Sequence, residues 1–296
     1  MPELRRILCP VDFSEFSMRA YQHALSVASH YDAKLFVQHV VELWRYPYAD
    51  FASAELYDQF FRTLCKKGEE EVQRFVKTCA HNEVRIESVV QEGMAPDNIL
   101  TFAKAQSVDL IVMGMHGRRG FDRLMLGSVT ERVMRNAPCP VLTVNKPSYD
   151  VIGSDQRPSP VHLNRILFCT DFSEHSQRAL DHAISLTAEY DAELTLLHVL
   201  EHAPDPVKIQ DAVATAIKQL DGLIPAEADK VRAGRTKTTV RIGKPYEQII
   251  QLAMEAPMDL VIMAVRGRGA LDLAVFGSTT YRVMQFGPCP VLAVRV

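Results

Sequence analysis

The chain repeats itself, and this duplication constrains its fold more than any other feature. At an offset of 159, Asp12-Phe13-Ser14-Glu15 recurs as Asp171-Phe172-Ser173-Glu174. Toward the end of each copy the offset becomes 150, and Pro138-Cys139-Pro140-Val141-Leu142 recurs as Pro288-Cys289-Pro290-Val291-Leu292. Matches of this number and order indicate a tandem duplication. Because the two offsets differ by nine, the first copy holds nine extra residues between about 41 and 93.

Each copy alternates short apolar runs with amphipathic stretches. In the first copy, Ile7–Val11 is typical of a buried strand, and Ser14 can cap the helix that follows. Further strands are expected at Leu35–Val40, from Val84-Arg85-Ile86, at Leu110–Met113 and at Val141–Val144, and further helices at about Ala54–Ala80, Pro96–Gln106 and Ser128–Asn136. The second copy repeats the scheme, with Pro225 expected to interrupt its long helical stretch. The pattern predicts an α/β fold of two tandem, doubly wound, open parallel sheets of five strands each, Rossmann-like in class.

A proline-rich segment without apolar periodicity separates the copies. It runs from about Asn145 to Leu163 and contains Pro147, Gly153 and Pro158. We therefore expect one domain at 1–146, a linker at 147–162 and a second domain at 163–296. The last strand of each domain, at Val141–Val144 and Val291–Val296, is predicted to be an exposed sheet edge, which invites pairing.

Composition excludes several classes of protein. The formal net charge of −3 gives no broad attraction to nucleic acid or to a membrane, and no apolar run approaches the roughly 20 residues of a membrane helix. The N-terminus leads directly into a strand, so no signal peptide is expected. The six cysteines form no C-x-x-C pair and are expected to be reduced core residues of a cytoplasmic protein. They are Cys9, Cys65, Cys79, Cys139, Cys169 and Cys289.

Spaced glycines follow the strand at Leu110–Met113. Gly114, Gly117 and Gly127-Ser128 make the pattern G-x2-G-x9-G-S. Glycines at a strand end let backbone approach a ligand closely, and a Gly-Ser pair that opens a helix offers free N–H groups to an anion. The second copy keeps this pattern, with Ala264 in place of the first glycine. The combination of glycines, serine, strand and duplicate predicts a phosphate site.

Asp12 follows the first strand and is the second component of this site. If the first and fourth strands are neighbours at the point where strand order reverses, Asp12 and the glycine loop face one crevice. Asp12 could then accept hydrogen bonds from a ribose or base, or help to hold a metal; the alternative is a turn or helix-capping carboxylate. The chain contains neither G-x4-G-K-[ST] nor G-x-G-x-x-G after its first strand, which argues against a P-loop ATPase and against ordinary dinucleotide binding.

These motifs resemble those of the universal stress protein family, in its tandem two-domain form. The resemblance rests on Pro10-Val11-Asp12, His39-Val40, the glycine pattern and Pro138-Cys139-Pro140-Val141, and it covers nearly all of the chain outside the linker and 42–80. It implies that the final strands pair the halves as a pseudo-dimer. Members with this glycine pattern bind ATP, whereas a subgroup without it does not, so the resemblance implies an ATP site.

The resemblance places Asp12 near ribose and adenine, the backbone of Val11 and Val40 at the base, and the glycines around the phosphates. His116 and Arg118 could add donors or be solvated loop residues. The nucleotide-binding residues that it implies are Pro10, Val11, Asp12, Val40, Met113, Gly114, His116, Gly117, Arg118, Gly127, Ser128, Val129 and Thr130 in the first copy, and Thr170, Asp171, Val199, Gly267, Arg268, Gly277, Ser278 and Thr279 in the second.

The second copy departs from the pattern at Ala264. A positive φ there would strain an alanine, by about 1 kcal/mol; otherwise its methyl could crowd a phosphate. Arg266 and Arg268 could compensate through charge-assisted contacts. We therefore expect the first site to be the more dependable one.

The expected function is ATP binding, with Mg²⁺, that regulates a stress response through the bound state. Phosphoryl transfer needs a positioned nucleophile and charge stabilisation, and no kinase motif set is present, so at most very slow ATP hydrolysis is expected. The alternatives are a protein-interaction module without nucleotide and a slow hydrolase. A protein partner and a homodimer of the whole chain are further expectations. His39 and His198 recur in register and are expected to be partly buried, with a metal role as the alternative.

Aromatic residues gather where the first copy gains residues. They are expected to cover the sheet or, alternatively, to contact a partner. They are Trp44, Tyr46, Tyr48, Phe51, Tyr57, Phe60 and Phe61.

Overall fold

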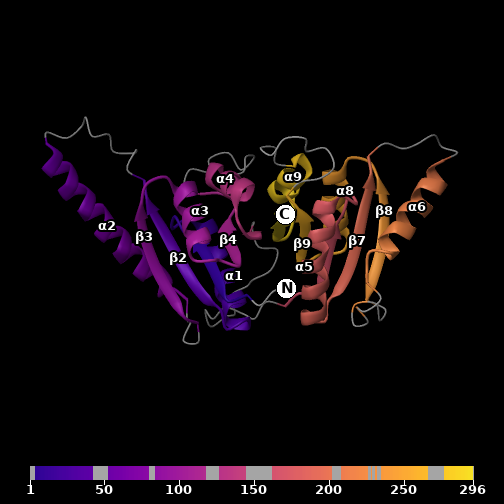
Figure 1. Ribbon diagram of the computed structural model, residues 1–296, viewed down its shortest axis with the longest axis horizontal. Coiled ribbons are helices and arrows are strands. Elements are labelled where there is room, and N and C mark those ends of the chain that lie inside the picture. The colour runs from indigo at the N-terminus through magenta and orange to yellow at the C-terminus, as the bar shows by residue number, and fades with distance from the viewer. Residues whose placement is uncertain are drawn as a thin grey trace. The chain divides into compact units, whose positions relative to one another are not determined.

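The computed structural model describes residues 4–42, 53–79, 84–117, 127–144, 162–201, 208–225, 228, 231, 235–265 and 277–295. These residues belong to two compact units, a first half that ends at Val144 and a second half that begins at His162 (Figure 1). The expected linker at 147–162 lies outside the described residues except for His162.

Within the described residues, the first half is a parallel sheet of five strands. Its strands are β1 (Arg6–Pro10), β2 (Lys34–Val41), β3 (Ile86–Glu92), β4 (Leu110–Gly114) and β5 (Val141–Val144), and its helices are α1 (Glu15–His30), α2 (Ala54–Val76), α3 (Ala95–Ala105) and α4 (Ser128–Asn136). The strand order is β3-β2-β1-β4-β5, and every neighbouring pair is parallel. The predicted α/β fold with a doubly wound parallel sheet is confirmed.

The second half repeats this topology. Its strands are β6 (Arg165–Cys169), β7 (Glu193–Leu200), β8 (Thr236–Ile242), β9 (Leu260–Ala264) and β10 (Val291–Val294), and its helices are α5 (Glu174–Tyr190), α6 (Ile209–Asp221), α8 (Pro245–Glu255) and α9 (Ser278–Phe286). The order β8-β7-β6-β9-β10 matches that of the first half, again with parallel neighbours. The pairing of the halves through β5 and β10 stays a prediction.

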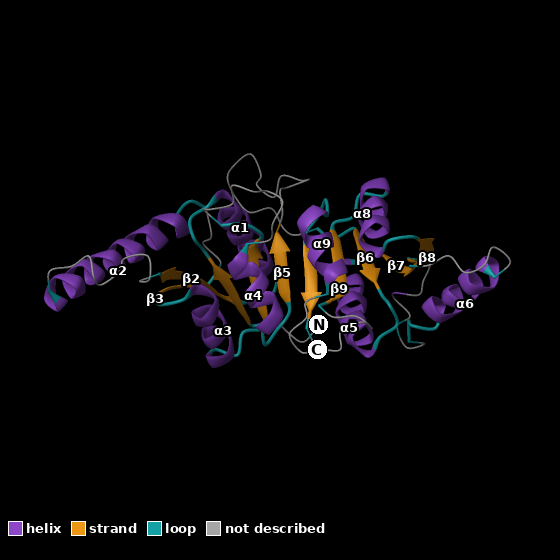
Figure 2. Ribbon diagram, turned by 90° about the horizontal axis from the view of Figure 1, so that it is seen from above, coloured by secondary structure: helices purple, strands orange, loops and turns teal. Residues whose placement is uncertain are grey.

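Helices cover both faces of each sheet. In the first half, α1 and α2 lie on one face and α3 and α4 on the other (Figure 2). The Tyr21 hydroxyl of α1 donates to the carbonyl of Val76 in α2 at 3.0 Å. On the opposite face, the rings of Phe36 and Phe102 lie 5.2 Å apart. In the second half, α5 and α6 share one face, and α8 and α9 share the other.

The central strands are continuous apolar runs because helices bury them from both sides. Ile7, Leu8 and Ile111 are completely buried at the centre of the first sheet. Full burial of such a side chain contributes about 1.5–3 kcal/mol. All six cysteines are free and five are buried, which confirms the prediction of core thiols without disulfides; Cys65 is half-buried.

One helix ends earlier than predicted, and another ends where a proline was expected to interrupt it. α2 stops at Val76 rather than near Ala80, where the Thr78 hydroxyl donates to the carbonyl of Phe75 at 2.6 Å. This local bond competes with helical pairing. α6 ends at Asp221, with Gly222 after it and Pro225 beyond, as expected for a proline that cannot continue a helix.

Of the aromatic cluster, the first four members lie outside the described residues. Tyr57, Phe60 and Phe61 lie in the first turns of α2 and are half-buried. Both interpretations of the cluster therefore stay open.

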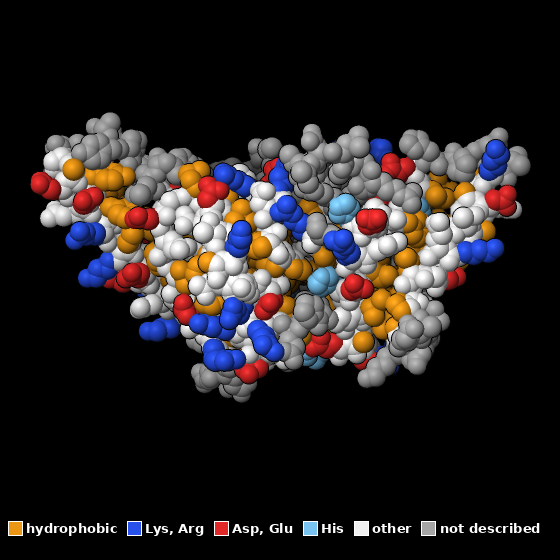
Figure 3. All heavy atoms as spheres, viewed as in Figure 1, with side chains coloured by type: hydrophobic (Ala, Val, Ile, Leu, Met, Phe, Trp, Pro, Cys, Tyr) orange, Lys and Arg blue, Asp and Glu red, His pale blue; other side chains and the backbone are white. Residues whose placement is uncertain are grey.

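Side chains of both charges are interspersed over the face shown in Figure 3, with hydrophobic side chains between them. This distribution fits the small net charge of −3. Among the helices that the structure describes, none is long and apolar enough to span a membrane.

Candidate functional site

The strand order of the first half reverses between β1 and β4. β1 pairs with β2 on one side and with β4 on the other, with Ile7 opposite Leu110 and Leu8 opposite Ile111. Both strands are parallel, so their carboxyl ends lie at the same edge of the sheet. In open α/β sheets, ligands bind beyond this edge at the point of reversal. We call this place the β1–β4 crevice, and its first residues are Val11 and Met115.

Asp12 lies in a tight turn at the end of β1. Its Oδ1 accepts a hydrogen bond from the Ser14 N–H at 3.0 Å, and the Ser14 hydroxyl caps α1 by accepting from the Ser17 N–H at 3.2 Å. Between them, Phe13 has a φ of 64°, in the left-handed region that costs a residue with a Cβ about 1 kcal/mol. Asp12 is thus a turn carboxylate with one oxygen already hydrogen-bonded, which was the alternative to a ligand-binding role.

The other carboxylate oxygen of Asp12 faces the glycine loop. A Cβ placed on Gly117 would lie 2.6 Å from Asp12 Oδ2, closer than real Cβ contacts come. The end of β1 and the loop after β4 therefore meet across the crevice, as the order of the strands predicted. A side chain at 117 would collide with this carboxylate, so glycine permits the close approach.

The first turn of α4 closes the other side of the glycine loop. The Gly127 N–H donates to the carbonyl of Met115 at 2.9 Å, and the Thr130 hydroxyl donates to the carbonyl of Gly114 at 3.0 Å. No side chain among the described residues caps this helix. The N–H groups of its first turn lack helical partners, so an anion can accept from them. A Cβ at Gly127 would lie 3.0 Å from the Met115 carbonyl, so glycine permits this close approach.

Comparison with known proteins decides the family. A model of the universal stress protein family matches residues 3–145 and again 162–295. The chain belongs to the universal stress protein family. The tandem form that the motifs implied is therefore confirmed.

Relatives of this universal stress protein match about half of it at a time. A universal stress protein of Methanocaldococcus jannaschii is 35% identical over 143 residues, which is 48% of this chain and 83% of the relative. One from Bacillus subtilis is 31% identical over 148 residues, 45% of this chain and 99% of the relative. A crystal structure of a universal stress protein from Archaeoglobus fulgidus covers 99% of this chain and 97% of its own, with a TM-score of 0.70 at 20% identity, and shows the shared fold.

The universal stress protein fold explains Gly114 by packing. A Cβ on Gly114 would lie 2.8 Å from the backbone carbon and oxygen of Phe16 in α1. Gly114 does not have a left-handed φ, and Ala264 is not among the described residues with positive φ. The alanine of the second half therefore carries no strain of that kind. In the first half, a methyl group at this position would be directed at α1, the helix that follows the first strand.

Several other residues that the resemblance implies lie partly or wholly in the core or pack against a neighbouring ring. Met113 and the Thr130 side chain are buried in the core, and Val40 is half-buried in β2. The His116 ring packs edge-on against Phe16 at 5.1 Å. Arg118 lies outside the described residues.

His39 has a positioning role that the sequence did not reveal. Its Nδ1 lies 2.9 Å from the Val11 carbonyl, and because a carbonyl only accepts, this nitrogen carries the proton. Its ring centroid lies 4.4 Å from that of Phe13. The same contacts recur between His198, the Thr170 carbonyl at 2.8 Å, and Phe172 at 4.4 Å. In the sequence, the recurrence of Phe13 and His39 as Phe172 and His198 was the signal that could have indicated this contact.

The second half keeps the turn and the helix start. Asp171 Oδ1 accepts from the Ser173 N–H at 3.0 Å and from the Ser173 hydroxyl at 2.6 Å. The Gly277 N–H donates to the Val265 carbonyl at 3.1 Å, before Ser278 and Thr279 in the first turn of α9. Gly267, Arg266 and Arg268 lie outside the described residues, and Val199 is half-buried in β7. The buried Thr170 hydroxyl lies 2.9 Å from both the Phe172 N–H and Ser176 Oγ.

Among the described residues, no group of three or more His, Cys, Asp or Glu side chains could hold a metal ion. Asp12 is thus the one carboxylate of the described crevice loops, 11–14, 115–117 and 127–130. Among the described residues of these loops, a cation would find a carboxylate ligand only at Asp12.

Proposed function

We propose that this universal stress protein binds ATP in the β1–β4 crevice and acts as a regulator through its bound state. The observation that carries the proposal is the approach of Asp12 Oδ2 to Gly117, next to the uncapped first turn of α4. One side of the crevice thus offers a carboxylate that can accept from hydroxyl groups. The other side offers N–H groups suited to phosphate. A mononucleotide carries hydroxyl groups for the carboxylate and phosphates for the N–H groups.

Each part of the crevice has a role in this proposal. Asp12 accepts from the ribose or base, and the backbone beside Val40 contacts the base. The loop at Gly117 and the N–H groups from Gly127 to Val129 hold the phosphates. Mg²⁺ would bind chiefly to phosphate oxygens and water, with Asp12 as its protein ligand. Glycine suits both loop positions because a Cβ at Gly117 would meet Asp12 Oδ2 and a Cβ at Gly127 would meet the Met115 carbonyl.

Regulation rather than catalysis is proposed because the sequence lacks the known motifs of fast phosphoryl transfer. Fast phosphoryl transfer uses a lysine or arginine against the phosphates and a group that orients the nucleophile. The sequence contains neither the P-loop lysine motif nor a kinase motif set, and the loop arginines Arg118, Arg119 and Arg123 lie outside the described residues. We therefore propose that hydrolysis is very slow at most.

A crystal structure of another universal stress protein is a complex with cAMP.

The decisive experiment begins with mass spectrometry of the denatured protein, to detect nucleotide carried through purification. Titration calorimetry of nucleotide-free protein with ATP, ADP and AMP then measures affinity, with and without Mg²⁺. Saturable ATP binding with one or two sites per chain is expected. If nucleotide-free, folded protein takes up none of the three, the proposal is wrong and a protein-interaction module becomes the better description. Rapid ATP turnover that Asp12→Ala abolishes would overturn the regulatory part.

A further inference from the structure

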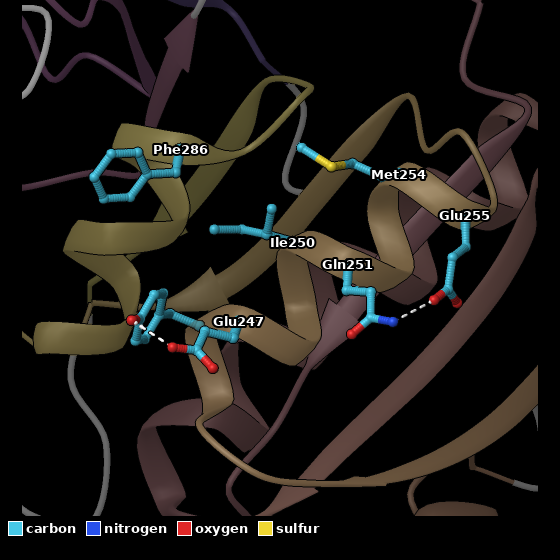
Figure 4. Close-up of a pocket in the computed structure, with 7 residues that line it drawn as sticks. Glu247, Ile250, Gln251, Met254, Glu255 and Phe286 are labelled. Atoms are coloured by element: carbon cyan, nitrogen blue, oxygen red, sulfur yellow. Dashed lines mark hydrogen bonds between the residues drawn. The ribbon is translucent and has the colours of Figure 1, made fainter.

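A groove lies between α8 and α9 of the second half (Figure 4). Its volume is about 520 Å³. The apolar side chains of Ile250, Met254 and Phe286 line it and form what we call the α8–α9 patch. Met254 is 60% exposed and Phe286 45% exposed, although both are large and apolar. Exposed apolar surface gathered at one place indicates an interaction site.

The first half shows that the fold does not need this patch. At the offset of 150, the counterparts of Ile250, Met254 and Phe286 are Leu100, Lys104 and Asn136. Lys104 and Asn136 are exposed on α3 and α4, in the same topology. The same two-helix surface is therefore stable with a cation and an amide where the second half exposes a methionine and a phenylalanine. The apolar pair is a property of the second half alone.

Charged groups of both signs surround the patch. The Glu247 carboxylate accepts from Lys244 Nζ at 3.1 Å and from the Tyr246 hydroxyl at 2.8 Å. At the other end of α8, the Glu255 carboxylate pairs with Arg241 and accepts from Gln251 at 2.7 Å. The Arg282 guanidinium lies over the Tyr246 ring at 4.5 Å. A surface with an apolar centre and both charges at its rim is complementary to itself.

We propose that the α8–α9 patch docks against the same patch of a second copy of this chain, across a two-fold axis. Such an interface needs one self-complementary surface, and it closes at the dimer. Phe286 and Met254 would pack against their symmetry mates, and each rim carboxylate would meet a cation of the other copy. Because Met254 and Phe286 are both so exposed, a small molecule in the groove would leave much of each side chain in water. A protein surface could cover both, so we favour a protein partner.

The size of the patch sets the strength of this dimer. A stable complex buries about 800 Å² on each partner, whereas one large aromatic side chain buries about 150–250 Å². Three partly exposed side chains supply only a fraction of the larger area. The dimer is therefore weak and forms as protein concentration rises.

Sedimentation velocity on the nucleotide-free full-length chain, across a wide concentration range, tests the proposal. The average mass of the wild type should rise from one chain toward two. The double variant Met254→Lys, Phe286→Asn places the first half's residues in the patch, so it should fold normally by circular dichroism and stay at one chain. A wild type that remains monomeric throughout, a double variant that associates like the wild type, or assembly beyond two chains would overturn the proposal.

A matched control comes from the first half. Met94 is 43% exposed, and its counterpart in the second half is Lys244. The variant Met94→Lys therefore removes an exposed methionine outside the patch and replaces it with a residue that the same fold already carries at this position. It should associate like the wild type. The reciprocal variant Lys104→Met, Asn136→Phe adds a second patch and should form assemblies larger than dimers. If Met94→Lys blocks association as strongly as the patch variant, or the added patch leaves the mass unchanged, the α8–α9 patch is not the interface. Because no nucleotide is present, these results do not depend on ATP binding.

Discussion

Gly117 and Asp12 face each other so closely that a Cβ on the glycine would lie 2.6 Å from Oδ2 of the aspartate. The two residues come from the ends of β4 and β1, which are neighbours in the sheet although far apart in the chain. The absence of a side chain at 117 therefore lets the loop after β4 approach the Asp12 carboxylate this closely.

Substitution of Gly117 should therefore impair nucleotide binding. In Gly117→Val, the branched side chain displaces the Asp12 carboxylate and fills the crevice. We expect ATP affinity to fall roughly tenfold or more, about 1.4 kcal/mol, by titration calorimetry. Gly222→Ala is the matched control, since a Cβ there would meet its nearest atom at an ordinary 3.4 Å. If Gly117→Val binds like the wild type while the fold is intact, the glycine loop is only a tight turn.

Two substitutions of Asp12 should separate its roles in the turn and in binding. Asp12→Asn keeps an oxygen that can accept from the Ser14 N–H but removes the charge, whereas Asp12→Ala removes both. We expect each to weaken ATP binding, the asparagine by about 1 kcal/mol because a charge-assisted hydrogen bond becomes a neutral one. Only the alanine variant should also lose stability, measured by urea unfolding. An asparagine variant with wild-type affinity would assign Asp12 to the turn alone.

Much of this arrangement could be predicted from the sequence. Apolar runs of four or five residues between amphipathic stretches indicate a parallel sheet buried on both faces, and the duplicate gives each assignment a second instance. That Asp12 and Gly117 would meet followed from chain direction, because parallel strands place their carboxyl ends at one edge. These features depend on local periodicity and topology, which a single sequence records.

The roles of Gly114 and His39 could not be predicted in the same way. Gly114 is a glycine because the backbone of Phe16, from a different element, occupies the space where a Cβ would be. His39 holds the Val11 carbonyl across two neighbouring strands. Both depend on distances between elements, and sequence spacing does not contain these distances. A glycine that serves helix packing and one that serves a ligand look identical in a motif.

The packing role of Gly114 predicts an effect on stability. Gly114→Ala introduces a methyl group 2.8 Å from the Phe16 backbone, so α1 must shift. Overpacking of this kind should lower the free energy of unfolding by about 1–3 kcal/mol in urea titration. In the second half, Ala264→Gly removes a methyl group that its surroundings already accommodate and should cost about 1 kcal/mol or less. A Gly114→Ala variant that loses ATP binding at unchanged stability would instead assign this glycine to the ligand.

Acid should destabilise the protein through two histidines that occupy equivalent positions on α1 and α5. Burial lowers the pKa of His23 from 6.5 to about 4, and burial also lowers the pKa of its counterpart His182. Since the unfolded chain takes up protons near pH 6.5 and the folded chain only near pH 4, unfolding is favoured increasingly as pH falls between these values. Stability is retained above pH 6.5. We expect the urea midpoint to drop between pH 7 and pH 5, and to drop less in His23→Gln, which cannot titrate. An equal drop in this variant would show that other groups set the acid sensitivity.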